Sequence, residues 1–238
     1  MKKIMFLLAF LTATIGVTSA QTADEIMTKS VEARGGADKL KALKSIKMES
    51  TTSVMGMDLS SKSVIVNKRG MRNDIEVMGQ TITMAIDGNK GWMINPMQGG
   101  GDPVEMPEEQ LKASMSQLDL AGMTNLKEEG TAAELLGKEN LDGTEVYKVK
   151  TTSKDGTVIT HYIDTKTYYT LKMAIKMKVA DKDIDAETKM SNYKVVEGIA
   201  FPHTTEIVSP EAGTITTTIK KIEVNPMVDE SIFAMPKK

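Results

Sequence analysis

The sequence predicts a mainly β (α+β) fold built around one curved antiparallel sheet of about eleven strands. Strand-like segments recur about every ten residues, and short turns rich in Gly, Asn and Asp separate them. Turns this short join antiparallel neighbours, so the sheet should be a meander. The expected strands span residues 44–54, 58–68, 71–78, 80–87, 90–94, 144–152, 157–164, 168–179, 186–195, 201–209 and 214–224.

The segment 168–179 has the clearest strand pattern. Met173 and Met177 belong to a run of apolar residues at odd-numbered positions, whereas Lys172 and Lys176 occupy even-numbered positions. This alternation gives the strand one dry face and one wet face, as in a sheet that packs on a core with one side only.

The last expected strand changes phase. Its apolar residues stand at odd-numbered positions up to Ile219 and at even-numbered positions from Ile222 onward. One extra residue in the strand would produce this change, so we predict a β-bulge near Lys220-Lys221.

Two helices are expected before the first strand. Thr22 and Glu25 have the spacing of a capping box, and the apolar residues that follow recur at helical spacing until Gly35-Gly36. A second short helical piece, residues 37–43, leads into the first strand.

The middle of the chain interrupts the strands. Pro107 is well placed at the first turn of a helix, and Leu111, Met115 and Leu118 mark the apolar side of that helix. A further short helix is expected at residues 126–136.

One apolar sheet face and few helices restrict the architecture. A flat sheet would leave that face in water, so the sheet must curl over its own core or be covered. A strongly curved sheet with helices packed across its concave side meets both requirements. The pattern leaves open whether the space between sheet and helices is filled or hollow.

Residues 1–20 are predicted to be a cleavable signal peptide. Lys2 and Lys3 form a basic start, an apolar stretch of residues 4–17 follows, and small residues precede a cleavage point after Ala20. The apolar stretch is shorter than the roughly 20 residues of a membrane span. We therefore expect export to the periplasm and one mature domain, residues 21–238.

Composition excludes several classes of protein. The chain has no cysteine, so it has neither disulfides nor the cysteine that a lipid anchor requires. Without residues 1–20 it carries 28 basic and 32 acidic residues, with no basic block of the kind that binds nucleic acid.

Seventeen methionines remain in residues 21–238, and methionine suits adaptable apolar surfaces. This abundance is equally explained as a compositional habit of the source.

Three segments resemble the periplasmic lipoprotein carrier (LolA/LolB-like) superfamily. Residues 87–96 resemble its Asp-Gly-x-x-x-Trp-x-x-Asn-Pro hairpin. Residues 67–72 resemble the Lys-Arg turn one hairpin earlier, and residues 231–236 resemble the Phe-x-x-x-Pro ending. The order of elements over residues 23–236 is similar too.

The resemblance implies an incomplete β-barrel with a helical lid over an apolar cavity that accepts acyl chains. It also implies that Arg69 takes part in lid closure and cargo transfer. The strand faces and the central helix then predict the ligand-binding lining of the cavity: Met48, Met84, Trp92, Leu111, Met115, Leu118, Met173 and Met177.

No arrangement of residues indicates catalysis, a metal or a cofactor. His161 and His203 lie on expected strands without short-spaced partners, so we interpret them as surface or hydrogen-bonded histidines. Ser191 and Lys194 have a Ser-x-x-Lys spacing, but on a strand rather than a helical turn. Residues 181–185 imitate the start of a calcium loop without its glycine, and a polar hairpin turn is the simpler interpretation.

We therefore predict a monomeric, non-enzymatic carrier of a lipid or lipoprotein in the bacterial envelope. Its partners would be acyl chains, an inner-membrane donor protein and an outer-membrane acceptor protein. Two alternatives stay open: a binding module or sensor that retains another apolar ligand, and a structural domain with a filled core.

Overall fold

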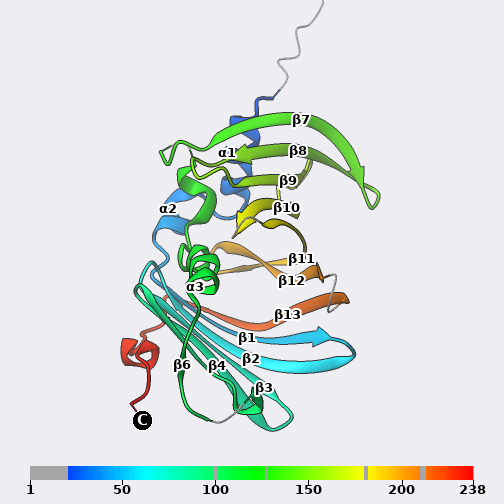
Figure 1. The fold of residues 1–238 in the computed structure, drawn as a ribbon. Helices are drawn as coiled ribbons and strands as arrows, with labels where there is room; N and C mark the ends of the chain where they lie inside the picture. The colour runs from blue at the N-terminus through cyan, green and yellow to red at the C-terminus, as the bar shows by residue number, and fades with distance from the viewer. Residues whose placement is uncertain (1–20, 99–100, 127, 180–181, 210–212, 238) are drawn as a thin grey trace, which may run out of the picture.

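The computed structural model describes residues 21–98, 101–126, 128–179, 182–209 and 213–237, and of these the side chains of 113, 177–179, 182–184 and 209 are not described. Thirteen strands form one antiparallel sheet in the order β6-β5-β4-β3-β2-β1-β13-β12-β11-β10-β9-β8-β7. The sheet curves strongly around the helices, and its edge strands β6 and β7 do not pair with each other (Figure 1). The predicted mainly β fold with an incomplete barrel is confirmed.

The strands are β1 (Ser45–Val54), β2 (Met57–Val66), β3 (Gly70–Val77), β4 (Gln80–Asp87), β5 (Lys90–Ile94), β6 (Val104–Glu105), β7 (Ala132–Leu141), β8 (Thr144–Thr152), β9 (Val158–Asp164), β10 (Thr170–Val179), β11 (Lys182–Val196), β12 (Ile199–Ser209) and β13 (Gly213–Val224). The helices are α1 (Ala23–Ala33), α2 (Ala37–Lys41) and α3 (Glu108–Met115), with 3₁₀ turns η1 (Pro96–Gln98), η2 (Ser116–Leu118), η3 (Gly122–Asn125) and η4 (Glu230–Phe233). Among the described residues, no helix is both long and apolar enough to cross a membrane.

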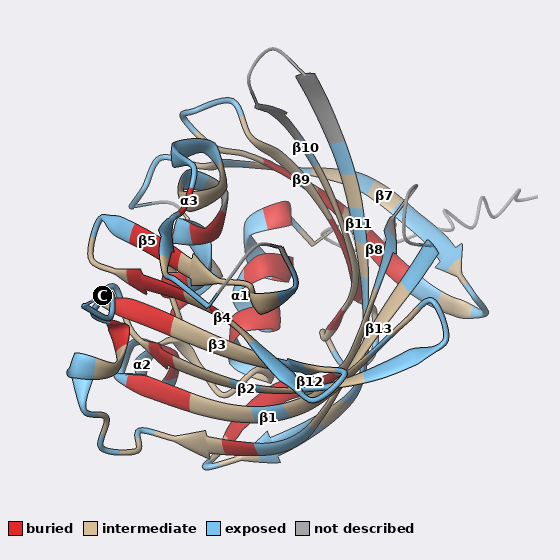
Figure 2. Ribbon diagram, turned by 60° about the horizontal axis from the view of Figure 1, so that its bottom comes forward, coloured by how far each residue is buried: buried red, intermediate tan, exposed pale blue. Residues whose placement is uncertain are grey.

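Helix α1 lies inside the curve of the sheet (Figure 2). The predicted capping box fixes its start, because Thr22 accepts a hydrogen bond from Glu25 N and the Glu25 carboxylate accepts one from Thr22 N. Ile26 and Met27 then pack on β8 and β9.

A second cluster joins α1 and α2 to the centre of the sheet. Val31 of α1 and Leu40 of α2 pack with Ile46 of β1, Phe201 of β12 and Ile222 of β13. The helices therefore fill the end of the barrel where the β11–β12 turn lies.

The expected bulge in the last strand is confirmed. Lys221 pairs with Glu49, whereas Ile219 pairs with Ser50, so Lys220 is the extra residue. The bulge returns the apolar residues on both of its sides to the same face of β13.

The predicted helix at residues 126–136 is wrong. The described part of this region contains the strand β7, which begins at Ala132. Ala, Glu and Leu favour a helix locally, but pairing with β8 lets Ala133 and Leu135 pack beside α1, and this tertiary gain overrides the propensity. The short edge strand β6 was also not predicted.

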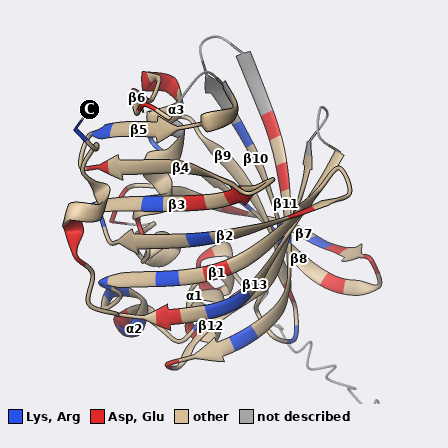
Figure 3. Ribbon diagram, turned by 90° about the horizontal axis from the view of Figure 1, so that it is seen from below, with Lys and Arg blue, Asp and Glu red and all other residues tan. Residues whose placement is uncertain are grey.

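The convex surface carries charges of both signs. Figure 3 shows acidic and basic residues interspersed along the strands of this surface. Lys221 and Glu223 on β13, for example, form an ion pair at 2.6 Å. Pairs this exposed contribute little to stability, so this surface is mainly a solvated one.

Candidate functional site

The concave face of the sheet is the candidate ligand site. On β1 it carries the even-numbered residues, because Ile46 and Met48 pack against the helices. Cross-strand partners share a face, so the register places Ile65, Met71 and Ile86 of β2, β3 and β4 on this face as well.

Many apolar side chains on this face are only half-buried. On the arm formed by β1 to β6, the register groups Met48, Ile75, Ile82, Met84 and Met93. On the arm formed by β7 to β13, it groups Ile159, Met173, Ile175, Ile215 and Ile219. A close-packed core would bury such residues completely, so this surface remains available to an apolar ligand.

The helical segment of α3 and η2, the lid segment, covers part of this face. Leu118 is 3% exposed and packs with Ile65, Met71 and Ile86, and Leu111 lies against the same group. Met115 is 39% exposed and does not belong to this cluster.

The turn between β2 and β3 holds the end of the lid segment. The Lys68 backbone N–H donates to the Leu118 carbonyl at 2.8 Å, and the Asn67 Oδ1 atom accepts from the Leu120 N–H at 3.1 Å. Lys68 also faces Asp119, with 3.8 Å between the charged atoms. These contacts attach the lid segment at one point.

Arg69, in the same turn, reaches a different element. Its guanidinium pairs with Asp87 and, at 3.0 Å, with Glu230 of η4. The hydrogen bond to Asp87 is the main reason why the pKa of Arg69 is raised. The side chain thus ties the turn to the C-terminal segment, and none of the contacts that the structure describes for it reaches α3.

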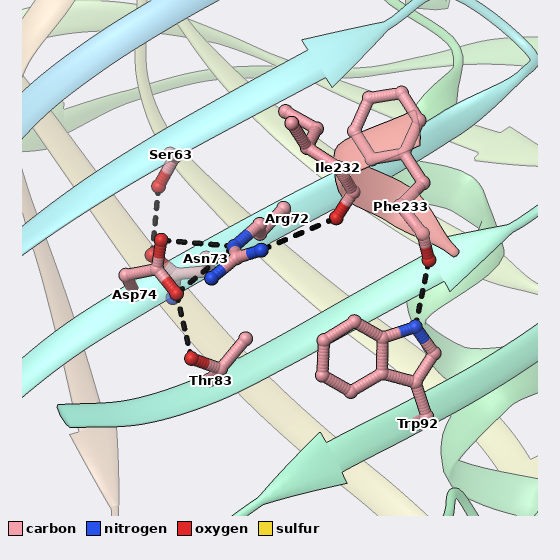
Figure 4. A network of polar contacts seen from close by, with 8 residues as sticks. All are labelled: Ser63, Arg72, Asn73, Asp74, Thr83, Trp92, Ile232 and Phe233. Atoms are coloured by element: carbon pink, nitrogen blue, oxygen red, sulfur yellow. Dashed lines mark hydrogen bonds and ion pairs between the residues drawn. The ribbon is translucent and has the colours of Figure 1, made fainter. Parts of the chain in front are cut away.

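Trp92 is not on the concave face, and this prediction is corrected. Its cross-strand partner is Ala85, whereas Met93 pairs with Met84 on the concave side. The Trp92 Nε1 atom donates to the Phe233 carbonyl at 2.7 Å, which places the indole under the C-terminal segment (Figure 4). At 2% exposure, the side chain is part of the convex packing.

A polar network fixes the C-terminal segment beside Trp92. Arg72 donates to the Ile232 carbonyl at 3.3 Å and is held by Asp74 at 3.0 Å, which also accepts from Thr83 at 2.7 Å (Figure 4). Trp92 belongs to the motif in residues 87–96, and Phe233 belongs to the motif in residues 231–236. The two motifs therefore meet on the convex face of the sheet.

The remaining predicted residues divide between the two arms. Met48, Met84, Leu111 and Leu118 lie on the arm that carries the lid segment. Met173 lies on the opposite arm, and the side chain of Met177 falls outside those that the structure describes. The structure thus does not gather all eight predicted residues at one place.

On the arm formed by β1 to β6, three half-buried concave residues were missed: Ile75, Ile82 and Met93. Ile82 and Met84 are two positions apart on β4, so strict alternation from Met84 identifies Ile82. The cross-strand partners of these two residues are Ile75 and Met93, which only the register reveals.

His161 is a buried histidine on the concave face. Its Nε2 atom lies 3.0 Å from the Thr151 hydroxyl, while Nδ1 has no partner among the described residues. Burial lowers the pKa of His161 to about 4, so the ring is neutral near pH 7. His203 is also buried, with Nδ1 3.1 Å from the Phe201 carbonyl oxygen. The expectation of hydrogen-bonded strand histidines is confirmed.

Within the described part of the chain, no three His, Asp or Glu side chains come close enough to hold a metal ion.

A separate cleft of about 250 Å³ lies between α1 and the segment around η3. Met27, Val31, Met123 and Leu126 contribute its apolar walls.

The fold is similar to that of several solved structures. A LolA superfamily protein from Nitrosomonas europaea has 13% identity and a TM-score of 0.58, over 90% of this chain and 98% of that one. A DUF1329 family protein from Desulfovibrio piger has 13% identity and a TM-score of 0.59, over 90% and 98%. A domain named for outer membrane lipoprotein sorting, from Vibrio parahaemolyticus, has 13% identity and a TM-score of 0.56, over 88% and 94%.

These likenesses confirm, at the level of the fold, the resemblance to the LolA superfamily. No family model and no curated protein matches the sequence.

Proposed function

We propose that this protein is a carrier that binds the acyl chains of a lipid or lipoprotein on its concave face and moves them towards the outer membrane. The single observation that carries this proposal is the set of half-buried apolar side chains on both arms of that face, beside a lid segment attached at the β2–β3 turn. The similar folds include a LolA superfamily protein and a domain named for lipoprotein sorting, which supports the same class of cargo.

The available free energy is sufficient for this task. Burial of one methylene group is favourable by about 0.8 kcal/mol, so about fifteen methylenes could gain on the order of 10 kcal/mol before the costs of binding. Met48, Met84 and Met93 have flexible side chains, which would let one surface accept chains of different shape.

Export and the envelope partners belong to the same proposal. The signal peptide, residues 1–20, would be removed after Ala20, and the mature domain, residues 21–238, would act in the periplasm as a monomer. An inner-membrane donor protein and an outer-membrane acceptor protein would deliver and receive the cargo. An intact mass of the exported protein that includes residues 1–20 would contradict the cleavage.

Arg69 would influence lid closure or release indirectly. Asn67 and Lys68 of its turn hold the lid segment, and Arg69 fixes that turn to Asp87 and Glu230. A change at Arg69 would therefore reach the lid segment through the backbone of the turn.

The test compares two tryptophan substitutions on one strand. Met84→Trp adds bulk to the concave face, and Thr81→Trp adds the same bulk at an exposed position on the opposite face of β4. In a hollow site, Met84→Trp should fold with nearly unchanged stability and bind a fluorescent fatty-acyl probe at least several-fold more weakly. Thr81→Trp should bind as the wild type does.

A filled core predicts a different result. Overpacking would then cost Met84→Trp roughly 1–3 kcal/mol of unfolding free energy. If the wild-type mature protein binds no acyl probe and Met84→Trp is clearly destabilised, the carrier proposal fails. Retention of native lipid without exchange into vesicles would indicate a sensor instead.

A further inference from the structure

A band of polar, uncharged side chains crosses the concave face between apolar surfaces. We call it the polar band. It consists of Asn73 on β3, Ser61 and Ser63 on β2, Ser50 and Thr52 on β1, Thr217 on β13 and Thr205 on β12. All seven side chains are half-buried, and none of them is ionisable.

The sheet register makes the band continuous. Three cross-strand pairs are hydrogen-bonded: the Ser63 hydroxyl donates to Asn73 Oδ1 at 2.9 Å, and the hydroxyls of Ser50 and Ser61 lie 2.7 Å apart. The hydroxyls of Thr52 and Thr217 lie 3.0 Å apart. These pairs follow one another diagonally across four adjacent strands.

Apolar residues flank the band on both sides. On β3, Met71 precedes Asn73 on the concave face and Ile75 follows it. On β13, Ile215 and Ile219 stand on either side of Thr217 in the same way. Strands β3 and β13 are separated by β1 and β2. Each of them thus places one polar residue in an otherwise apolar row of its concave face.

The band retains unused hydrogen-bonding capacity. A hydroxyl has one donor and two acceptor lone pairs, so each pair can still accept from a third group. The Asn73 amide carries two further donors on Nδ2, and these bond to no residue that the structure describes. A bare hydrocarbon laid across the band would bury these groups without partners, which is unfavourable.

We infer that the ligand of the concave face is a neutral amphiphile with ester, amide or hydroxyl groups next to its acyl chain, such as an acylglycerol, and that the polar band binds those groups. This inference rests on the proposed function and specifies its substrate class. The Asn73 amide donors suit a carbonyl oxygen, and the hydroxyls suit either a carbonyl or a hydroxyl. Because the band has no charged residue, it offers nothing that would compensate a buried carboxylate.

The experiment measures displacement of a fluorescent acyl probe from the mature protein by two competitors with the same chain length. The wild type should prefer monopalmitoylglycerol to palmitate by about tenfold. The double variant Thr52→Val/Thr217→Val removes both partners of one pair without a change of shape and should lose about three- to tenfold of that preference. Asn73→Leu should lose a similar factor.

The matched control lies on the same two strands. Thr51 and Thr218 are also cross-strand partners, but on the convex face, so Thr51→Val/Thr218→Val should keep the preference. Circular dichroism of each variant separates a lost preference from a lost fold, and Ser63→Ala provides a milder substitution within the band.

The possible failures are distinguishable. If probe and competitors bind, but the wild type and both band variants prefer neither competitor, the polar band has no role and the carrier proposal stands. If the probe does not bind to the wild type at all, both proposals fail.

Discussion

The two faces of strands β3 to β5 are packed in opposite ways. On the convex face, Trp92 is 2% exposed and Phe233 is fully buried, with a hydrogen bond between them. On the concave face of the same strands, Met84 and Met93 are half-buried and pair with each other across β4 and β5. The rigid aromatic residues Trp92 and Phe233 thus stabilise the fold, whereas the flexible methionines Met84 and Met93 line the candidate site.

Close packing on the convex face also explains Gly70. A Cβ atom at this position would lie 2.9 Å from the Phe233 ring and 2.6 Å from the Ile86 carbonyl oxygen. The C-terminal segment therefore approaches the backbone of β3 more closely than any other residue type would allow.

The largest effect is expected at Trp92. Trp92→Ala should lower the unfolding free energy by about 3–5 kcal/mol, because it leaves a cavity and the Phe233 carbonyl loses its donor. Met84→Ala should cost clearly less, since that side chain is only half-buried. Urea denaturation of both variants measures the difference, and equal costs would mean that the two faces are packed alike.

The second prediction concerns the buried part of the concave face. The pKa of His161 in the folded protein, about 4, is below its value of about 6.5 in the unfolded chain, so the unfolded state binds more protons. The contribution of neutral His161 to the unfolding free energy is therefore fully present above pH 6.5, and it is lost as the pH falls from 6.5 through 4. The loss should be on the order of 3 kcal/mol.

Unfolding of the wild type and of His161→Gln between pH 7 and 4 tests this prediction. Both proteins lose stability through their carboxylates, so the difference between the two curves isolates the histidine. Parallel curves would show that the ring can be protonated in the folded state at no cost.

The third prediction concerns the junction between the two faces, at Arg69. Arg69→Leu should change the melting temperature little, because its ion pairs with Asp87 and Glu230 are partly exposed to solvent. It should alter the release rate of an acyl probe through the β2–β3 turn. Glu230→Gln is the matched control for loss of one pair, and a large loss of stability with unchanged release would assign Arg69 to the convex packing alone.

The smallest effect is expected at two hairpin tips beyond both faces. Met55 and Met78 have φ angles of 49° and 50°, each followed by a glycine with positive φ, and they are 69% and 80% exposed. Asparagine adopts this conformation more readily. Met78→Asn should thus raise the unfolding free energy by about 0.5–1 kcal/mol and leave probe binding unchanged. Weaker binding would extend the ligand site to the tips.

The sequence was sufficient to predict the elements whose signals are local. The capping box of Thr22 and Glu25, the bulge at Lys220 and the alternation around Met173 each appear within a few residues. The sequence was insufficient to predict which residues face the helices where both faces of a strand are covered. On β5, Trp92 and Met93 are both apolar, so the pattern cannot tell which residue faces the helices. The register with β4 and the position of Phe233 decide it.

The polar band was hidden for a related reason. Ser and Thr occur on both faces of β1 and β13, so their number says nothing about the ligand site. The band becomes visible only through the cross-strand partners, such as Thr52 with Thr217, that are far apart in the sequence. Strand β7 likewise depends on its partner β8 rather than on its own composition.

The pairing of β1 with β13 has a consequence for how the chain folds. Its partners are separated by about 160–180 residues, whereas every other pair in the sheet joins strands that follow each other along the chain. Each arm can therefore form early as a meander of local hairpins, and the central seam must close last because its loop is the longest. Until it closes, β1 and β13 are open edges that can pair with another molecule. The step that aligns the bulge at Lys220 with Glu49 and Ser50 should thus limit both the refolding rate and the yield of correctly paired protein.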